Sequence, residues 1–91
     1  MPDTFTPDLE LAILGGLLFN PDAIDTALAT LTEDDFASEG HRLIFAAIRA
    51  LSVSGRPVDP VTVAAALDAQ GVLTLTGGAG YLALLSVARL P

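Results

Sequence analysis

The residues best suited to chemistry are His41, the single histidine of the chain, and Ser38, which precedes it by one helical turn. A serine becomes a nucleophile only when a base lies within hydrogen-bonding distance, as part of a complete catalytic constellation. No such constellation is indicated, and a serine just before a helical run is a typical N-cap. We therefore expect no catalytic residue, and we keep a small helical enzyme centred on His41 as an alternative from a different class of function.

Side chains that could bind a metal ion also lie near this histidine in the sequence. They are Glu33, Asp34, Asp35, Glu39 and His41. The set lacks a recognised ligand spacing, and acids at two successive helix starts are explained by their favourable interaction with the helix dipole. We expect no metal site in this chain.

The glycine-rich run Gly77-Gly78-Ala79-Gly80 precedes a helical pattern and is similar to a phosphate-binding loop. Neither a following lysine nor a preceding strand accompanies it, so the motif is incomplete. Tight packing of the last helix explains these glycines better. We expect no cofactor in this chain.

Arg42, Arg49 and Arg56 recur at heptad spacing and would lie on one side of a helix. This arginine stripe either meets an acidic partner or is the solvated side of that helix, where Glu39 and Arg42 could pair at i and i+3. The acidic turn before the helix is the other charged candidate for partner binding. The candidate protein interface therefore consists of Arg42, Arg49, Arg56, Glu33 and Asp34.

Charge and hydrophobicity narrow the classes of partner. Eleven acids against four basic residues give a net charge of −7, which repels a phosphate backbone, so we expect no direct contact with DNA. Hydrophobic residues make up 52% of only 91 residues, which predicts that some apolar side chains face another protein.

Three features of the sequence bear on the cellular location. The longest apolar run, 11–19, is too short to cross a bilayer, and the acidic N-terminal flank is unlike a signal peptide. Cysteine is absent, so the chain has no disulfide bonds. We expect a cytoplasmic protein.

Apolar periodicity predicts helices along most of the chain. The residues Ile44, Ala47, Ile48 and Leu51 recur at i, i+3, i+4 and i+7 within 38–55, which we expect to be the central helix. Capping residues, prolines and glycines mark the other predicted elements. These are helices over 9–18, 21–29 and 60–70, a helical turn over 32–35, a loop over 72–76 and a last helix that contains Tyr81 and Leu82.

The predicted fold class is all-α, in a single domain of residues 1–91 with 1–7 as a flexible lead-in. Because no heptad pattern persists, we expect a compact orthogonal bundle of about four longer helices plus one or two short helical turns. Gly15 and Gly16 lie inside the first helix, where each costs roughly 1 kcal/mol relative to alanine. This pair predicts that another backbone passes close to the first helix.

An ordered series of short motifs runs from Leu9 to Ser86. It comprises residues 9–18 with Leu14, Gly15 and Gly16, then Asp35-Phe36, His41-Arg42-Leu43-Ile44-Phe45, residues 54–59 ending at Asp59, Thr62-Val63-Ala64, residues 67–71 ending at Gly71, Gly77-Gly78, Tyr81-Leu82-Ala83 and Leu85-Ser86. In this order and spacing, the chain resembles the N-terminal domain of DnaB-type replicative DNA helicases. No single motif is specific, but the ordered series is.

The resemblance implies assembly rather than catalysis. In that family, the N-terminal domains form a collar of paired domains above the motor ring of a homohexamer, and the collar receives a DnaG-type primase; a helicase loader is a further candidate partner. ATP and Mg²⁺ belong to a RecA-like motor domain, whose phosphate-binding motif this chain lacks. We expect the chain to be the globular head of an ATP-dependent DNA helicase, excised without the helical hairpin that follows the head in the family.

The helicase-binding domain at the C-terminus of bacterial primases is similar in fold and is an alternative. The ending with Gly77, Gly78 and Tyr81 favours the helicase. A small enzyme would lose its activity in His41→Ala, whereas a docking domain would change only in stability.

Overall fold

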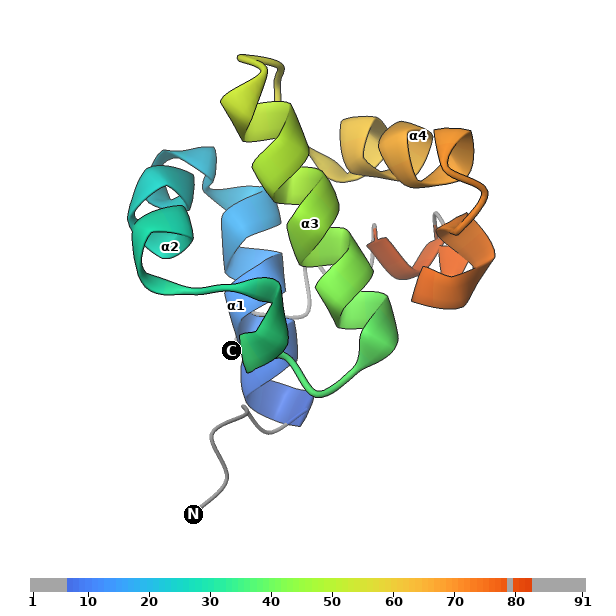
Figure 1. Ribbon diagram of the computed structural model, residues 1–91, viewed down its shortest axis with the longest axis horizontal. Helices are drawn as coiled ribbons and strands as arrows, with labels where there is room; N and C mark the ends of the chain where they lie inside the picture. The colour runs from blue at the N-terminus through green and yellow to red at the C-terminus, as the bar shows by residue number, and fades with distance from the viewer. Residues whose placement is uncertain (1–6, 79, 83–91) are drawn as a thin grey trace.

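The computed structural model describes residues 7–78 and 80–82, which form helices and turns without a strand (Figure 1). The elements are α1 (Pro7–Phe19), the 3₁₀ turn η1 (Pro21–Ala23), α2 (Ile24–Thr30), η2 (Glu33–Asp35), α3 (Glu39–Val53), α4 (Pro60–Ala69) and η3 (Leu73–Thr76). Gly78 and residues 80–82 are again helical. The predicted all-α class is confirmed, whereas a single domain of residues 1–91 stays a prediction.

The central helix α3 begins and ends at the residues that the sequence indicates. The Ser38 Oγ accepts the backbone N–H of His41 at 3.4 Å and caps the first turn. After the last turn, Gly55 adopts a left-handed φ of 74°, and the backbone N–H of Arg56 donates to the carbonyl oxygen of Leu51 at 2.9 Å. This is the glycine-terminated helix end that the sequence predicts.

The other elements pack around α3, which contacts α1, α2, α4, η2 and η3 (Figure 1). The predicted apolar stripe of Ile44, Ala47, Ile48 and Leu51 is at most 4% exposed. The rest of the buried apolar core consists of Leu14, Leu17, Leu18, Ile24, Phe36, Phe45, Val58, Val63, Leu67 and Leu82. Every main helix therefore contributes to one core centred on α3.

The helix α4 follows its predicted capping pattern. The Asp59 Oδ1 accepts the backbone N–H of Thr62 at 2.8 Å, and the Thr62 Oγ1 accepts the backbone N–H of Asp59 at 2.9 Å. Pro60 occupies the first turn, where its missing N–H has no helical acceptor. At the other end, Gly71 follows the last turn in a left-handed conformation. The start of α4 is therefore set by local hydrogen bonds, and its end by the glycine conformation.

The connection from α1 to α2 differs from the predicted helix over 21–29. Pro21–Ala23 forms the 3₁₀ turn η1, and the α-helix begins only at Ile24.

No single helix among the described residues is long and apolar enough to cross a bilayer. The helices Leu9–Phe19 and Pro21–Thr30 reach that length and hydrophobicity only when they are taken together, and the chain bends by 111° between them. The predicted close backbone approach is wrong at Gly16, because a Cβ built there meets nothing within 4 Å.

Two further boundaries differ from the prediction. Residues 72–76, predicted to be a loop, contain the 3₁₀ turn η3, because local bonds such as that from the Thr76 Oγ1 to the Leu73 carbonyl oxygen (2.7 Å) pair the backbone without a second strand. Pro7, predicted to lie in a flexible lead-in, begins α1. The rest of that lead-in and the end of the predicted last helix lie outside the described residues.

Candidate functional site

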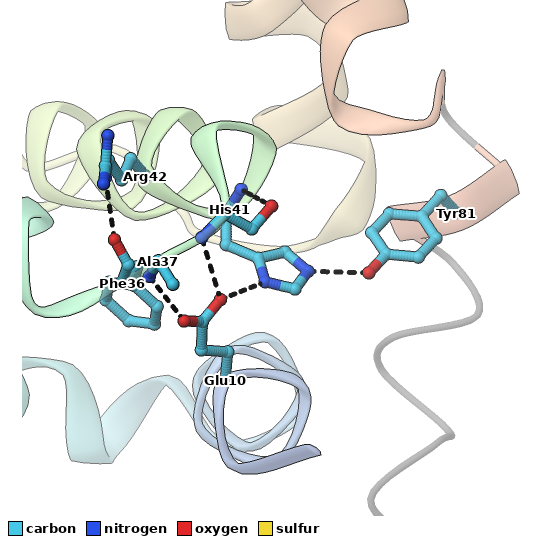
Figure 2. Close-up of polar contacts among 7 residues, drawn as sticks. Glu10, Phe36, Ala37, His41, Arg42 and Tyr81 are labelled. Atoms are coloured by element: carbon cyan, nitrogen blue, oxygen red, sulfur yellow. Dashed lines mark hydrogen bonds and ion pairs between the residues drawn. The ribbon is translucent and has the colours of Figure 1, made fainter. Parts of the chain in front are cut away.

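A buried carboxylate, Glu10 of α1, is the acceptor around which the interior polar contacts are arranged (Figure 2). Glu10 is only 1% exposed. Its Oε2 accepts the backbone N–H of Ala37 at 2.6 Å, and its Oε1 accepts that of Ser38 at 3.4 Å. The Oε1 also lies 2.7 Å from the Nδ1 of His41. Glu10 therefore fastens α1 to the segment that leads into α3.

His41, in the first turn of α3, connects Glu10 to Tyr81 (Figure 2). Its Nε2 lies 2.6 Å from the Tyr81 hydroxyl, and the two rings stack with centroids 5.9 Å apart and planes 9° apart. Because Nδ1 faces a carboxylate, it carries a proton and donates; in the neutral imidazole, Nε2 then accepts from the Tyr81 O–H. We call Glu10, His41 and Tyr81 the polar triad.

Burial and hydrogen bonding shift two pKa values in this triad. Burial raises the pKa of Glu10, but the hydrogen bonds from His41, Ala37 and Ser38, together with the charge of His41, outweigh burial and hold this pKa below its usual 4.5. Burial also raises the pKa of the Tyr81 hydroxyl above its usual 10.0, and the Glu10 carboxylate adds to that effect. At neutral pH, Glu10 is thus an anion and Tyr81 keeps its proton, as their hydrogen bonds require.

The triad leaves no nucleophile activated for catalysis. The Ser38 Oγ accepts the backbone N–H of His41 rather than bonding to the imidazole. Both imidazole nitrogens are bound within the fold, and His41 is only 6% exposed. These contacts give no support to the alternative of a small enzyme centred on His41.

The acids that the sequence grouped with His41 have other partners or face solvent. The Asp35 Oδ2 accepts the backbone N–H of Thr32 at 2.8 Å and caps η2, while Glu33 pairs with Arg49. Asp34 and Glu39 are exposed. Nowhere in residues 7–78 and 80–82 do three His, Asp or Glu side chains gather in a way that could hold a metal ion.

The arginines of the predicted stripe differ in the contacts that their side chains make. The Arg42 Nε donates to the carbonyl oxygen of Phe36 at 2.7 Å (Figure 2). The predicted Glu39–Arg42 pair is wrong, because the ion pairs within the described part of the chain are Glu10–His41 and Glu33–Arg49. Arg56 is exposed and belongs to neither pair.

The Arg49 side chain joins the turn η2 to α3. Its Nε donates to the Glu33 Oε2 at 3.1 Å, and its Nη2 donates to the carbonyl oxygen of Leu31 at 3.1 Å. The guanidinium also lies 5.5 Å from the centroid of the Phe45 ring, within cation–π range. These contacts leave the side chains of Arg49 and Glu33 only 34% and 33% exposed, so both are mainly structural.

Sequence reasoning missed Glu10, the carboxylate that holds His41. The available signal is a single acid within an otherwise apolar helical run, since a charge at such a position must be either paired or solvated. Its partner lies 31 residues away, so no spacing rule could identify it.

The family model for the DnaB-like helicase N-terminal domain matches residues 3–89 of this chain. The chain belongs to this family. Replicative DNA helicase DnaB of Mycobacterium leprae (strain TN) is 45% identical over 73 residues, which are 80% of this chain and 12% of that relative. The DnaB of Buchnera aphidicola subsp. Schizaphis graminum (strain Sg) is 37% identical over 79 residues, which are 87% of this chain and 17% of that relative.

A solved structure supports the same assignment. The N-terminal domain of DnaB helicase from Mycobacterium tuberculosis has a TM-score of 0.89 and 40% sequence identity to this DnaB-like domain. The match covers 100% of this chain and 62% of the other. This chain therefore spans less than two thirds of that structure and a still smaller share of the two curated relatives.

The residues that carried the family resemblance are mostly structural in this DnaB-like domain. Leu14, Phe36, Ile44, Phe45 and Leu82 are fully buried in the core. Asp35 and Asp59 cap η2 and α4. His41 and Tyr81 belong to the polar triad. Five glycines also belong to the series: Gly71, Gly77 and Gly78 have positive φ, Gly15 is buried and Gly16 is half-buried.

Proposed function

We propose that this DnaB-like domain is the non-catalytic assembly and docking domain of a replicative DNA helicase. In the longer protein, it contributes to the collar of the hexamer and receives a DnaG-type primase, with a helicase loader as a further partner. ATP hydrolysis, Mg²⁺ binding and DNA unwinding belong to a separate motor domain, and the protein works in the cytoplasm.

The observation that carries this proposal is the structural match to a DnaB N-terminal domain along the whole chain, at a TM-score of 0.89. Two relatives named as replicative DNA helicases, at 45% and 37% identity, support the same class of parent protein. The matches are to helicases and not to primases, which favours a helicase domain over the helicase-binding domain of a primase.

Within the candidate protein interface, Arg56 and Asp34 are the residues most suited to contact primase. Both are exposed and belong to neither ion pair of the described residues. Arg42 is also exposed, but its Nε binds the backbone of Phe36, while Arg49 and Glu33 bind each other. Arg56 also lines a shallow pocket of about 240 Å³ together with Val61, which is 77% exposed. An arginine beside exposed apolar surface is a favoured composition for a protein interface.

The test is calorimetric titration of the chain with the C-terminal domain of its cognate primase, accompanied by size exclusion with light scattering. We expect binding that Arg56→Gln weakens about tenfold, the effect of 1.4 kcal/mol. Thr74→Glu changes the net charge by the same amount at an exposed position on η3 and is the matched control. The function is wrong if neither this chain nor the full-length parent binds primase, and only the assignment of Arg56 is wrong if both variants bind like the wild type.

A further inference from the structure

An open apolar groove lies between α1 and α2. These two helices pack on one side of α3 (Figure 1). The chain turns by 111° between them, which leaves a space of about 780 Å³. Small apolar residues form much of the lining, namely Ala12, Gly16, Ala23 and Ala27. The larger Ile13, Leu17 and Phe19 also contribute, so the lining is mainly apolar although it faces solvent.

Gly16 gives this groove its depth. A Cβ built at Gly16 meets nothing within 4 Å, so the glycine does not serve to admit another described backbone. Glycine destabilises a helix interior relative to alanine, and no contact among the described residues offsets that loss. The empty space above Gly16 is therefore suited to a side chain that comes from outside the fold.

The acids near the groove outnumber the cations, because the one guanidinium beside its lining, that of Arg49 at the Leu31 carbonyl oxygen, is already paired with Glu33. No lysine or arginine occurs before Arg42, so the whole of α1, η1, α2 and η2 lacks a basic residue. Asp22 and Asp25 are exposed beside the lining residues Ala23 and Thr26, and neither forms an ion pair with a described residue. An apolar groove with exposed acids next to its lining residues in the chain attracts an apolar ligand that carries positive charge.

Shape and charge together select one kind of occupant. The thirteen residues of α1 extend for ~20 Å, which is enough for several turns of a partner helix to lie along it. A second copy of this chain would bring the same acids to the same face in a symmetric contact, and like charges would oppose each other. A membrane surface rich in anionic lipid would meet the same repulsion.

We propose that the α1–α2 groove binds a cationic amphipathic helix of a different protein. Its apolar residues fill the space above Gly16, and its lysines or arginines face Asp22 and Asp25. This inference rests on the proposed docking function and adds a position and a chemistry for one partner. It is independent of the pocket beside Arg56, which is formed by the end of α3 and by α4.

The test uses fluorescein-labelled synthetic helices and the whole 91-residue chain, with binding measured by fluorescence anisotropy. The probe has leucines at i, i+3, i+4 and i+7 and lysines on its other positions. One comparison peptide replaces the lysines with glutamates, and another scrambles the probe so that it loses its apolar face. We expect the probe to bind at least tenfold more tightly than either comparison peptide.

Two sets of variants locate the binding. Gly16→Leu fills the groove and lowers the affinity for the probe at least tenfold, whereas Ala50→Leu adds a leucine at an exposed position of α3 outside the groove and leaves the affinity unchanged. Circular dichroism confirms that both variants fold. The double variant Asp22→Lys, Asp25→Lys reverses the preference, so that the glutamate peptide binds more tightly than the probe.

Several outcomes overturn the proposal. Equal binding of the probe and the scrambled peptide indicates unspecific charge attraction, and an undiminished affinity of Gly16→Leu places the site elsewhere. A dimer in light scattering that Gly16→Leu dissociates assigns the groove to a second copy. Binding to phosphatidylglycerol vesicles that Gly16→Leu abolishes assigns it to a membrane surface.

Primase titration of the same variants separates this proposal from the proposed function. If primase binds the chain but the probe does not, the groove proposal fails and the docking function stands. If the probe binds as expected but primase binds neither the chain nor its parent, the groove is a docking site for another protein and the proposed primase function fails.

Discussion

The Oε1 of Glu10 on α1 lies 2.7 Å from the Nδ1 of His41 on α3, and this contact joins two helices across 31 residues of chain. Both residues are almost entirely buried, at 1% and 6% exposure. A buried charge is tolerated only where hydrogen bonds replace its lost hydration. Here both carboxylate oxygens accept hydrogen bonds, and no buried polar side-chain atom among the described residues lacks a partner. The contact therefore specifies how α1 is placed against α3.

Replacing Glu10 tests that role. Glu10→Gln keeps the size of the side chain but removes the charge, and its amide N–H₂ must face a backbone donor, either the Ala37 N–H or the Ser38 N–H. We expect a loss of about 2 kcal/mol in the free energy of unfolding, since a buried donor is left unsatisfied. Urea unfolding followed by circular dichroism measures it. Glu39→Gln, which removes an exposed acid from the first turn of α3, should change the stability by less than about 0.5 kcal/mol. Equal effects of the two variants would contradict a special role for Glu10.

The stability that Glu10 supplies should depend on pH. Its folded-state pKa lies below the usual 4.5, so the unfolded chain binds a proton at this site more readily than the folded one. The contribution is complete above pH 4.5 and disappears as the pH falls through the lower folded-state pKa. The difference in unfolding free energy between wild type and Glu10→Gln should therefore shrink as the pH falls below 4.5. A difference that grows on acidification would have the wrong sign for this interpretation.

The parts of this fold that were predictable are those determined within one turn of helix. Asp59 followed by Pro60 predicts the start of α4, and Ser38 and Gly55 predict both ends of α3, because caps act on adjacent backbone groups. The stripe of Ile44 and Ile48 likewise follows from helical period alone. Sequence-local rules thus place the helices and their buried sides.

The contacts that were not predictable join distant segments. Nothing near Glu10 in the sequence indicates that it contacts His41. Likewise, nothing near Arg49 indicates that it binds Glu33 of the turn η2. The α1–α2 groove depends on the angle between two helices, which local sequence does not determine. The pair Gly15 and Gly16 predicted a close backbone approach, whereas Gly16 has an open space beside it. The packing of the helices decides whether a glycine within a helix admits another backbone or leaves an open space.

Tyr81 offers a direct spectroscopic probe of the polar triad, because it is the only tyrosine and the chain has no tryptophan. Its pKa is raised by burial and by the Glu10 carboxylate. A titration of phenolate absorbance should therefore show a midpoint above 10.0, and Glu10→Gln should lower that midpoint because it removes the negative charge. The chain in urea provides the unperturbed reference. Identical midpoints in the folded and unfolded chain would contradict the placement of Tyr81 against His41.

Two glycine-to-alanine substitutions should have opposite effects on stability. At Gly16, an added Cβ meets nothing within 4 Å, so Gly16→Ala should stabilise the domain by about 1 kcal/mol through helix propensity. At Gly77, φ is +100° and the added Cβ would lie 2.8 Å from the Cβ and Cγ of Tyr81. We expect Gly77→Ala to cost about 1–3 kcal/mol, from backbone strain and from the displacement of Tyr81.

The second measurement for these variants is the midpoint of the Tyr81 phenolate titration. Gly77→Ala should move it toward the midpoint of the unfolded chain, because a displaced ring loses both its burial and its hydrogen bond to His41. Gly16→Ala should leave it unchanged, because Gly16 contacts none of the triad within the described structure. If Gly16→Ala destabilised the domain instead, the space above Gly16 would be filled, and the groove could not accept a partner there.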